Sequence, residues 1–182
     1  MRVSDGKACR TSTPTERKLL TPSAKSAHQT LRATRLGRRY TVSRDYAVSA
    51  EMVWADVLDF KALAESMKGR ATYEGLPEGD AGVGEAFTVT VRRRWSPPMR
   101  WTMKVVERDD AAMVLRSEEH GGPVRLYTHR LSVAATGPQS CRYTDELNVD
   151  AGLLTPLIAP TFRAMYEQRH VARKARLEGG HQ

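Results

Sequence analysis

Apolar and polar residues alternate along much of the chain, which is the pattern of β-strands that bury one face. The first alternating segment starts at Tyr40. Six more follow, separated by short connections of Pro, Gly and Asp, so neighbouring strands are expected to be antiparallel. The predicted strands cover residues 40–48, 71–76, 84–95, 99–108, 112–119, 124–135 and 141–149.

Two short helices are predicted between the first and second strands. Ser49 is a suitable N-cap for a helix over residues 50–60, because its side chain can accept a hydrogen bond from the first helical turn. A second helix over residues 61–67 is expected to stop at Gly69, since glycine readily adopts the left-handed conformation that follows many helices.

A long helix is predicted to end the chain. Thr155 and Pro156 form a cap followed by a proline at the first helical position, and Pro160 is expected to kink the helix or to mark its true start. Arg173 is expected away from the apolar stripe, which consists of Leu154, Ile158, Phe162, Met165 and Arg169. A second row, expected on the flank with His170 in a surface or capping role, is Phe162, Tyr166, His170 and Lys174.

The order of elements predicts an α+β fold, in which a curved seven-stranded antiparallel sheet wraps around the long C-terminal helix. An antiparallel sheet with one apolar face has to cover that face, and a single helix is too narrow to cover seven flat strands. The sheet must therefore curl, and curling leaves space between sheet and helix. The alternative is that the same side chains fill a dry core.

Apolar side chains of the strands and the last helix are expected to line this space. Methionines are frequent among them, as on surfaces that adapt to varied apolar shapes. The residues predicted to contact a ligand are Phe87, Val89, Val91, Met99, Trp101, Met103, Met113, Tyr127, Leu131, Tyr143, Leu147, Ile158, Phe162, Met165 and Tyr166.

The net charge of +8 belongs to the N-terminal segment. Residues 1–39 carry ten basic and two acidic residues, whereas the remainder of the chain carries 19 of each. A neutral domain lacks the basic surface that specific nucleic-acid recognition needs. We therefore expect a disordered basic leader over residues 1–38, a ligand-binding domain over 39–178 and a disordered tail over 179–182. The leader could be a solvated tail, an organelle transit peptide or a product of a misassigned start codon.

The cysteine content predicts neither a disulfide framework nor a zinc site. Cys9 lies in the leader and Cys141 in the domain, with no ligand cluster around them, so no metal or cofactor is expected and a reducing, cytoplasmic location is favoured. No stretch reaches the roughly 18–20 apolar residues that a membrane helix needs. The expected oligomeric state is a monomer or a weak dimer.

His129 and Asp145 are the best candidates for acid–base chemistry. Both are expected on the inner face of a hairpin whose register pairs Val133 with Cys141, Leu131 with Tyr143, His129 with Asp145, and Tyr127 with Leu147. A histidine beside a carboxylate at a cavity is the arrangement of an oriented general base. The alternative is a buried pair that only satisfies its own hydrogen bonds.

Arg93 is a second polar candidate. Alternation sends its side chain to the opposite face from Arg92 and Arg94, where it could meet an anionic head group. The alternative is a solvated strand edge whose charges discourage pairing with another strand.

Several segments between about Arg39 and Leu177 resemble the SRPBCC superfamily, the START-like helix-grip fold of polyketide cyclases, pollen-allergen proteins and lipid-transfer domains. They are the segment 48–54 (VSAEMVW), Asp59-Phe60, the segment 143–146 (YTDE) and the segment 166–170 (YEQRH). The resemblance implies binding of a small hydrophobic or amphipathic molecule and, in some members, its cyclisation or dehydration.

Three functions fit these observations. The first is a binding protein for a small hydrophobic molecule, with His129, Asp145, Tyr127 and Tyr143 as polar contacts. The second is a cyclase- or dehydratase-type enzyme in which His129 and Asp145 move protons on an enolisable substrate. The third is an interaction module whose cavity is vestigial and whose basic leader contacts a partner.

Overall fold

The computed structural model describes residues 37–79, 82–94 and 96–179. The predicted leader therefore lies outside the described residues, apart from its last two positions. The predicted tail does so too, apart from Gly179, which ends the last helix. Among the helices of these ranges, none combines the length and the apolar character that a bilayer crossing requires.

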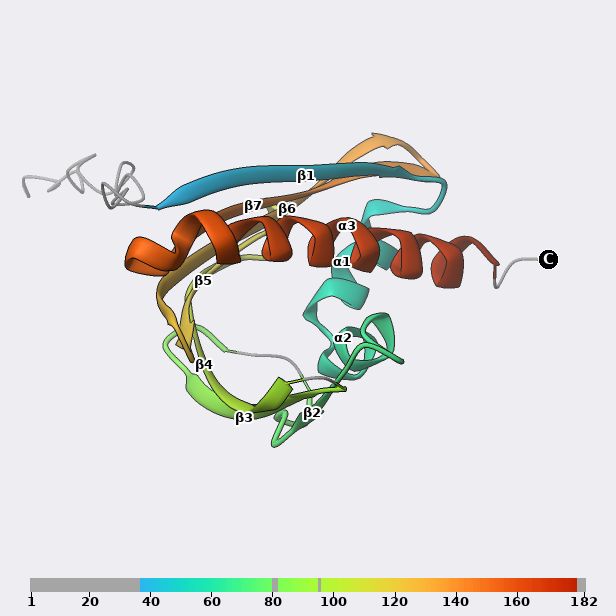
Figure 1. Ribbon diagram of the computed structural model, residues 1–182. Helices are drawn as coiled ribbons and strands as arrows, with labels where there is room; N and C mark the ends of the chain where they lie inside the picture. The colour runs from blue at the N-terminus through green and yellow to red at the C-terminus, as the bar shows by residue number, and fades with distance from the viewer. Residues whose placement is uncertain (1–36, 80–81, 95, 180–182) are drawn as a thin grey trace, which may run out of the picture. The chain divides into compact units, whose positions relative to one another are not determined.

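One antiparallel sheet of seven strands curves around the C-terminal helix α3, as Figure 1 shows, so the predicted α+β helix-grip fold is confirmed. The strand order is β1-β7-β6-β5-β4-β3-β2. The strands are β1 (Arg38–Tyr46), β2 (Ala71–Glu74), β3 (Ala86–Arg93), β4 (Ser96–Asp109), β5 (Val114–Gly121), β6 (Val124–Gly137) and β7 (Ser140–Asp150). The helices are α1 (Ala50–Leu58), α2 (Phe60–Ser66), the short 3-10 helix η1 (Gly152–Leu154) and α3 (Thr155–Gly179).

The two short helices meet at Asp59, which corrects the predicted boundary. Ser49 caps α1 as expected, accepting from the Met52 amide at 3.3 Å. Asp59 has an extended backbone and accepts from the Lys61 amide at 2.8 Å, so it ends α1 and caps α2. The first helix is therefore shorter than predicted, because a capping aspartate competes with helix continuation.

Strand β4 starts earlier than predicted and includes Pro97 and Pro98, which were expected in a turn. The β3–β4 pairing shifts register between Val91 and Arg93, next to these prolines. A register irregularity tolerates residues that lack a backbone N–H donor. The two strands therefore pair close to their connection.

The predicted β6–β7 register is wrong by two residues. Leu131 pairs with Asp145 and His129 with Leu147, because the strands extend to Gly137 and Ser140 around a shorter turn. A shift of two residues keeps every side chain on its predicted face, since the side-chain period of a strand is two. The inward set is thus correct although the partners are not.

Helix α3 is continuous through Pro160, and its inward face is more polar than predicted. His170 and Arg173 are 0% and 1% exposed, so the expected surface role of His170 and the expected position of Arg173 are both wrong. Arg173 Nε donates to Asp56 Oδ2 of α1 at 2.6 Å, and Arg176 pairs with the other oxygen of the same carboxylate. These ion pairs connect α1 to α3, and the Arg173 pair lies in the interior.

Candidate functional site

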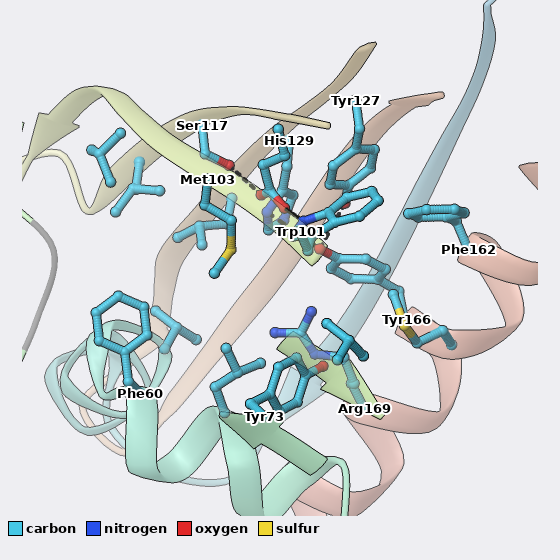
Figure 2. Close-up of a pocket in the computed structure, with 18 of the residues that line it drawn as sticks. Phe60, Tyr73, Trp101, Met103, Ser117, Tyr127, His129, Phe162, Tyr166 and Arg169 are labelled. Atoms are coloured by element: carbon cyan, nitrogen blue, oxygen red, sulfur yellow. Dashed lines mark hydrogen bonds between the residues drawn. The ribbon is translucent and has the colours of Figure 1, made fainter. Parts of the chain in front are cut away.

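A cavity of about 140 Å³ lies between the concave face of the sheet and helices α2 and α3 (Figure 2). Of the two alternatives, an open space and a dry core, the structure shows the space. The predicted ligand-contact residues that line it are Phe87, Val91, Met99, Trp101, Met103, Tyr127, Leu131, Phe162, Met165 and Tyr166.

Five predicted contact residues do not line the cavity. Val89, Tyr143 and Leu147 are almost fully buried within the apolar core. Ile158 of α3 is half-buried and packs against that core. Met113 has a positive φ of 51° in the β4–β5 connection, where it borders a separate surface hollow beside Trp54. Alternation predicts which side chains share a face. It does not predict which of them are covered by neighbouring residues.

Several lining residues were missed by the sequence analysis. Phe60 and Leu63 of α2 and Tyr73 of β2 close one side of the cavity. Ser117 and Glu119 line it from β5, where they continue the alternation that begins at Leu115. That alternation was a usable signal, which the polar character of Ser117 and Glu119 obscured.

Glu119 is a buried carboxylate held by two neutral donors. It is 6% exposed. Trp101 Nε1 donates to its Oε2 and Ser117 Oγ to its Oε1, both at 2.6 Å. Both oxygens therefore have partners, which is the condition for keeping a polar group in an apolar wall.

Aromatic rings form the wall next to this carboxylate. The ring centres of Tyr127 and Phe162 are 5.1 Å apart, and those of Trp101 and Phe162 are 5.9 Å apart. These separations fall in the range of favourable aromatic contacts. The wall is therefore fixed by packing between β4, β6 and α3.

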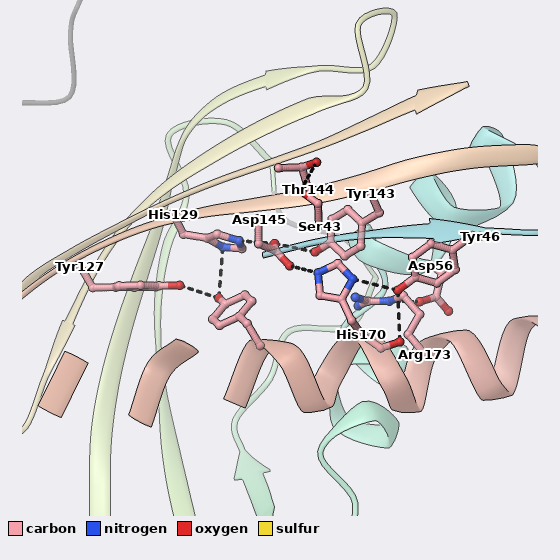
Figure 3. A network of polar contacts seen from close by, with 11 residues as sticks. Ser43, Tyr46, Asp56, Tyr127, His129, Tyr143, Thr144, Asp145, His170 and Arg173 are labelled. Atoms are coloured by element: carbon pink, nitrogen blue, oxygen red, sulfur yellow. Dashed lines mark hydrogen bonds and ion pairs between the residues drawn. The ribbon is translucent and has the colours of Figure 1, made fainter. Parts of the chain in front are cut away.

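Asp145 connects two buried histidines, as Figure 3 shows. Its Oδ1 lies 2.6 Å from His129 Nε2, and its Oδ2 lies 2.9 Å from His170 Nε2. Tyr143 also donates to Oδ1, at 2.7 Å. The His129–Asp145 contact expected from the sequence thus exists, although the residues sit diagonally rather than directly opposite each other.

The carboxylate of Asp145 is ionised in the fold. Burial alone would raise the pKa of Asp145, which is 1% exposed, but the hydrogen bonds and charges of His129 and His170 outweigh burial and hold this pKa below its usual range. An ionised carboxylate only accepts hydrogen bonds, so each imidazole presents Nε2–H to it. When such a ring is neutral, its Nδ1 is an acceptor.

Tyrosine hydroxyls stand at both Nδ1 atoms. Tyr46 Oη lies 3.1 Å from His170 Nδ1, away from the cavity lining. Tyr166 Oη lies 3.4 Å from His129 Nδ1, which is a long contact, and it accepts from the Tyr127 hydroxyl at 2.6 Å. Burial raises the pKa of Tyr127 and of Tyr166, so both hydroxyls keep their protons. At the cavity wall, Tyr166 therefore presents a protonated hydroxyl beside His129 Nδ1.

Only some residues of this network line the cavity. Tyr127, His129 and Tyr166 line the cavity, whereas Asp145 and His170 lie behind them. Asp145 is thus placed to orient His129 and stabilise its protonated form, not to touch a ligand. Within residues 37–79, 82–94 and 96–179, no group of three or more His, Cys, Asp or Glu side chains could hold a metal ion.

The family model described as "Polyketide cyclase / dehydrase and lipid transport" matches residues 38–178. This match agrees with the resemblance to START-like proteins seen in the sequence. None of the curated proteins matches the chain.

Solved structures share the fold at low sequence identity. Norcoclaurine synthase from Thalictrum flavum, in complex with dopamine and hydroxybenzaldehyde, has 20% identity and a TM-score of 0.59, covering 80% of this chain and 88% of its own. A START superfamily protein from Mycobacterium smegmatis has 17% identity and a TM-score of 0.61, covering 78% and 97%. The Zhui aromatase/cyclase from Streptomyces sp. R1128 has 19% identity and a TM-score of 0.55, covering 75% and 88%.

Proposed function

The chain belongs to the polyketide cyclase / dehydrase and lipid transport family, and on this premise we propose that it binds a small hydrophobic or amphipathic molecule between the sheet and α3. The observation that carries the proposal is the cavity of about 140 Å³. An engineered apolar cavity of about 150 Å³ in another protein binds benzene. The space here suits one aromatic ring or a short branched chain, with a longer tail leaving through the mouth.

The lining supports binding by burial and by a few oriented polar groups. Trp101, Tyr127 and Phe162 offer aromatic faces, and Met103 and Met165 are flexible side chains that adapt to the shape of the bound molecule. The Tyr166 hydroxyl can donate to a ligand oxygen, because its own contact with His129 is long. Apolar pockets with a few convergent polar groups are the usual form of small-molecule sites.

A cavity-filling variant tests this proposal. Val91→Phe adds a ring to the β3 wall, and we expect it to weaken binding of 3-phenylpropan-1-ol by roughly tenfold or more in calorimetric titrations. Val171→Phe makes the same change on the exposed face of α3, where Val171 is 53% exposed, and should leave binding unchanged. Failure of the unaltered protein to bind the alcohol or any co-purified small molecule, the latter sought by native mass spectrometry, would overturn the proposal.

A second candidate function is proton transfer on a carbonyl compound, as in a cyclase- or dehydratase-type enzyme. The observation that favours it is the placement of His129 and Tyr166 side by side on the cavity wall, with buried Asp145 behind His129. His129 Nδ1 would take a proton from the carbon next to the carbonyl, and the C–H electron pair would form the enolate C=C bond. Tyr166 would donate its hydrogen bond to the enolate oxygen, and Asp145 would stabilise the imidazolium.

Deuterium exchange tests this chemistry without knowledge of the natural substrate. In D₂O, the imidazolium exchanges its proton with solvent and returns a deuteron to the carbon of phenylacetone, which NMR detects. We expect His129→Gln to slow this exchange by about 100-fold and Tyr166→Phe to slow it as well. Tyr46→Phe removes the equivalent hydroxyl from His170 and is the matched control. An unchanged rate in His129→Gln would exclude the enzyme function.

A further inference from the structure

Arg169 brings a positive charge to the apolar cavity. Its side chain extends from α3 into the space beside Tyr73, as Figure 2 shows. Its guanidinium carbon lies 4.5 Å from the centre of the Tyr166 ring, which places the cation over an aromatic face. The charge is therefore held against the cavity by packing.

This guanidinium has no acidic partner among the residues that the structure describes. Its Nε atom is buried without a hydrogen-bond partner, and no described carboxylate forms an ion pair with the group. Arg173, one turn further along α3, has the usual partner of a buried arginine, because it forms an ion pair with Asp56. A cation in an apolar site without a counter-charge is unfavourable unless something else supplies that charge.

The two carboxylates closest to the site are already engaged. Glu119 accepts from Trp101 and Ser117, and Asp145 accepts from both histidines and from Tyr143. Neither forms an ion pair or a hydrogen bond with Arg169, although the charge of Asp145 acts from a distance to raise the pKa of this guanidinium. A carboxylate in direct contact with the guanidinium is therefore expected from outside the chain.

Tyr73 and Arg93 extend the positive region towards the solvent. Burial raises the pKa of the Tyr73 hydroxyl, the charges of Arg169 and Arg93 act to lower it, and the charge of Glu119 acts to raise it, so both cations and this carboxylate act on that hydroxyl. Arg93 is exposed and also lines the cavity, which places it where the cavity meets solvent. One end of the cavity thus combines two guanidinium groups with a hydroxyl donor.

We propose that Arg169 anchors the anionic group of an amphipathic carboxylate whose apolar body fills the cavity. This inference rests on the proposed binding function and names the chemical class of its ligand. A guanidinium fork binds a carboxylate through two parallel hydrogen bonds, and Arg169 retains its donors for that purpose. The cavity of about 140 Å³ then selects a single ring with a short acidic chain.

A pair of probes with the same carbon skeleton tests the inference. Calorimetric titration at pH 7 compares 3-phenylpropionate with 3-phenylpropan-1-ol, and we expect the carboxylate to bind at least about tenfold more tightly. Arg169→Met should remove this preference while retaining binding of the alcohol, and Arg169→Lys should keep part of it. Arg163→Met deletes a positive charge from the exposed face of the same helix and should leave the preference intact.

The outcomes separate this inference from the cavity proposal. Equal binding of both probes by the unaltered protein, or an undiminished carboxylate preference in Arg169→Met, overturns the role of Arg169 and leaves the cavity as a binding site for neutral molecules. Failure of both probes to bind overturns the cavity proposal and this inference with it. If Arg169→Met does not fold, the comparison of probes on the unaltered protein and on Arg169→Lys decides the question.

Discussion

Asp145 is the acceptor shared by two buried imidazoles and one tyrosine hydroxyl, and this sharing explains its ionisation inside the core. Because the folded-state pKa of Asp145 is depressed, its contribution to stability is fully present above its unfolded pKa, near 4. The contribution is lost as the pH falls from there towards the folded pKa. The network therefore makes the stability of the core depend on pH, with stability falling in acid.

We expect Asp145→Asn to lower the free energy of unfolding at pH 7 by about 3–5 kcal/mol, because an amide cannot accept from both imidazoles as the carboxylate does. The variant should also lose less stability than the unaltered protein between pH 4 and lower pH. Urea denaturation at several pH values measures both effects. Asp45→Asn, which alters an exposed carboxylate paired with Arg142, is the matched control and should change stability little. An identical acid dependence in Asp145→Asn would contradict the argument.

At the scale of elements, α1 and α3 are joined by one buried carboxylate between two arginines. Asp56 is 8% exposed and accepts from Arg173 Nε at 2.6 Å. We expect Asp56→Ala to reduce the free energy of unfolding by about 3–5 kcal/mol, since it leaves the buried Arg173 cation unpaired. Glu167→Ala, which breaks the exposed pair with Arg163 on the same helix, should cost less than about 1 kcal/mol. Equal losses in chemical denaturation would show that burial of the Asp56 pair contributes nothing.

The same elements show what the sequence could and could not predict. Alternation identified the strands and their inward faces, because a period of two survives an error of two residues in the β6–β7 register. It misplaced His170 and Arg173, because a polar residue in a helix indicates solvent unless its partner is known. Those partners, Asp145 and Asp56, lie 25 and 117 residues away along the chain. Such pairings depend on tertiary packing, which local periodicity does not contain.

At the scale of the whole domain, the cavity is bounded by elements distant in the sequence. Phe60 of α2, Trp101 of β4, Tyr127 of β6 and Phe162 of α3 all contribute to its wall. The cavity exists only when the sheet, α2 and α3 are assembled together. A molecule bound there is therefore in contact with the folded domain and not with any separate part of it.

Binding should for this reason stabilise the domain against unfolding as a unit. A ligand that binds only the folded state at about 100 times its Kd adds about 2.7 kcal/mol to the free energy of unfolding. We expect 3-phenylpropionate to raise the urea midpoint by that free energy divided by the slope of the transition, with the slope itself unchanged, because the surface exposed on unfolding stays the same. Val91→Phe should lose this stabilisation and Val171→Phe should keep it. A midpoint shift of the same size in Val91→Phe would place the ligand elsewhere, since the added ring occupies the space between β3 and α3 that the ligand needs.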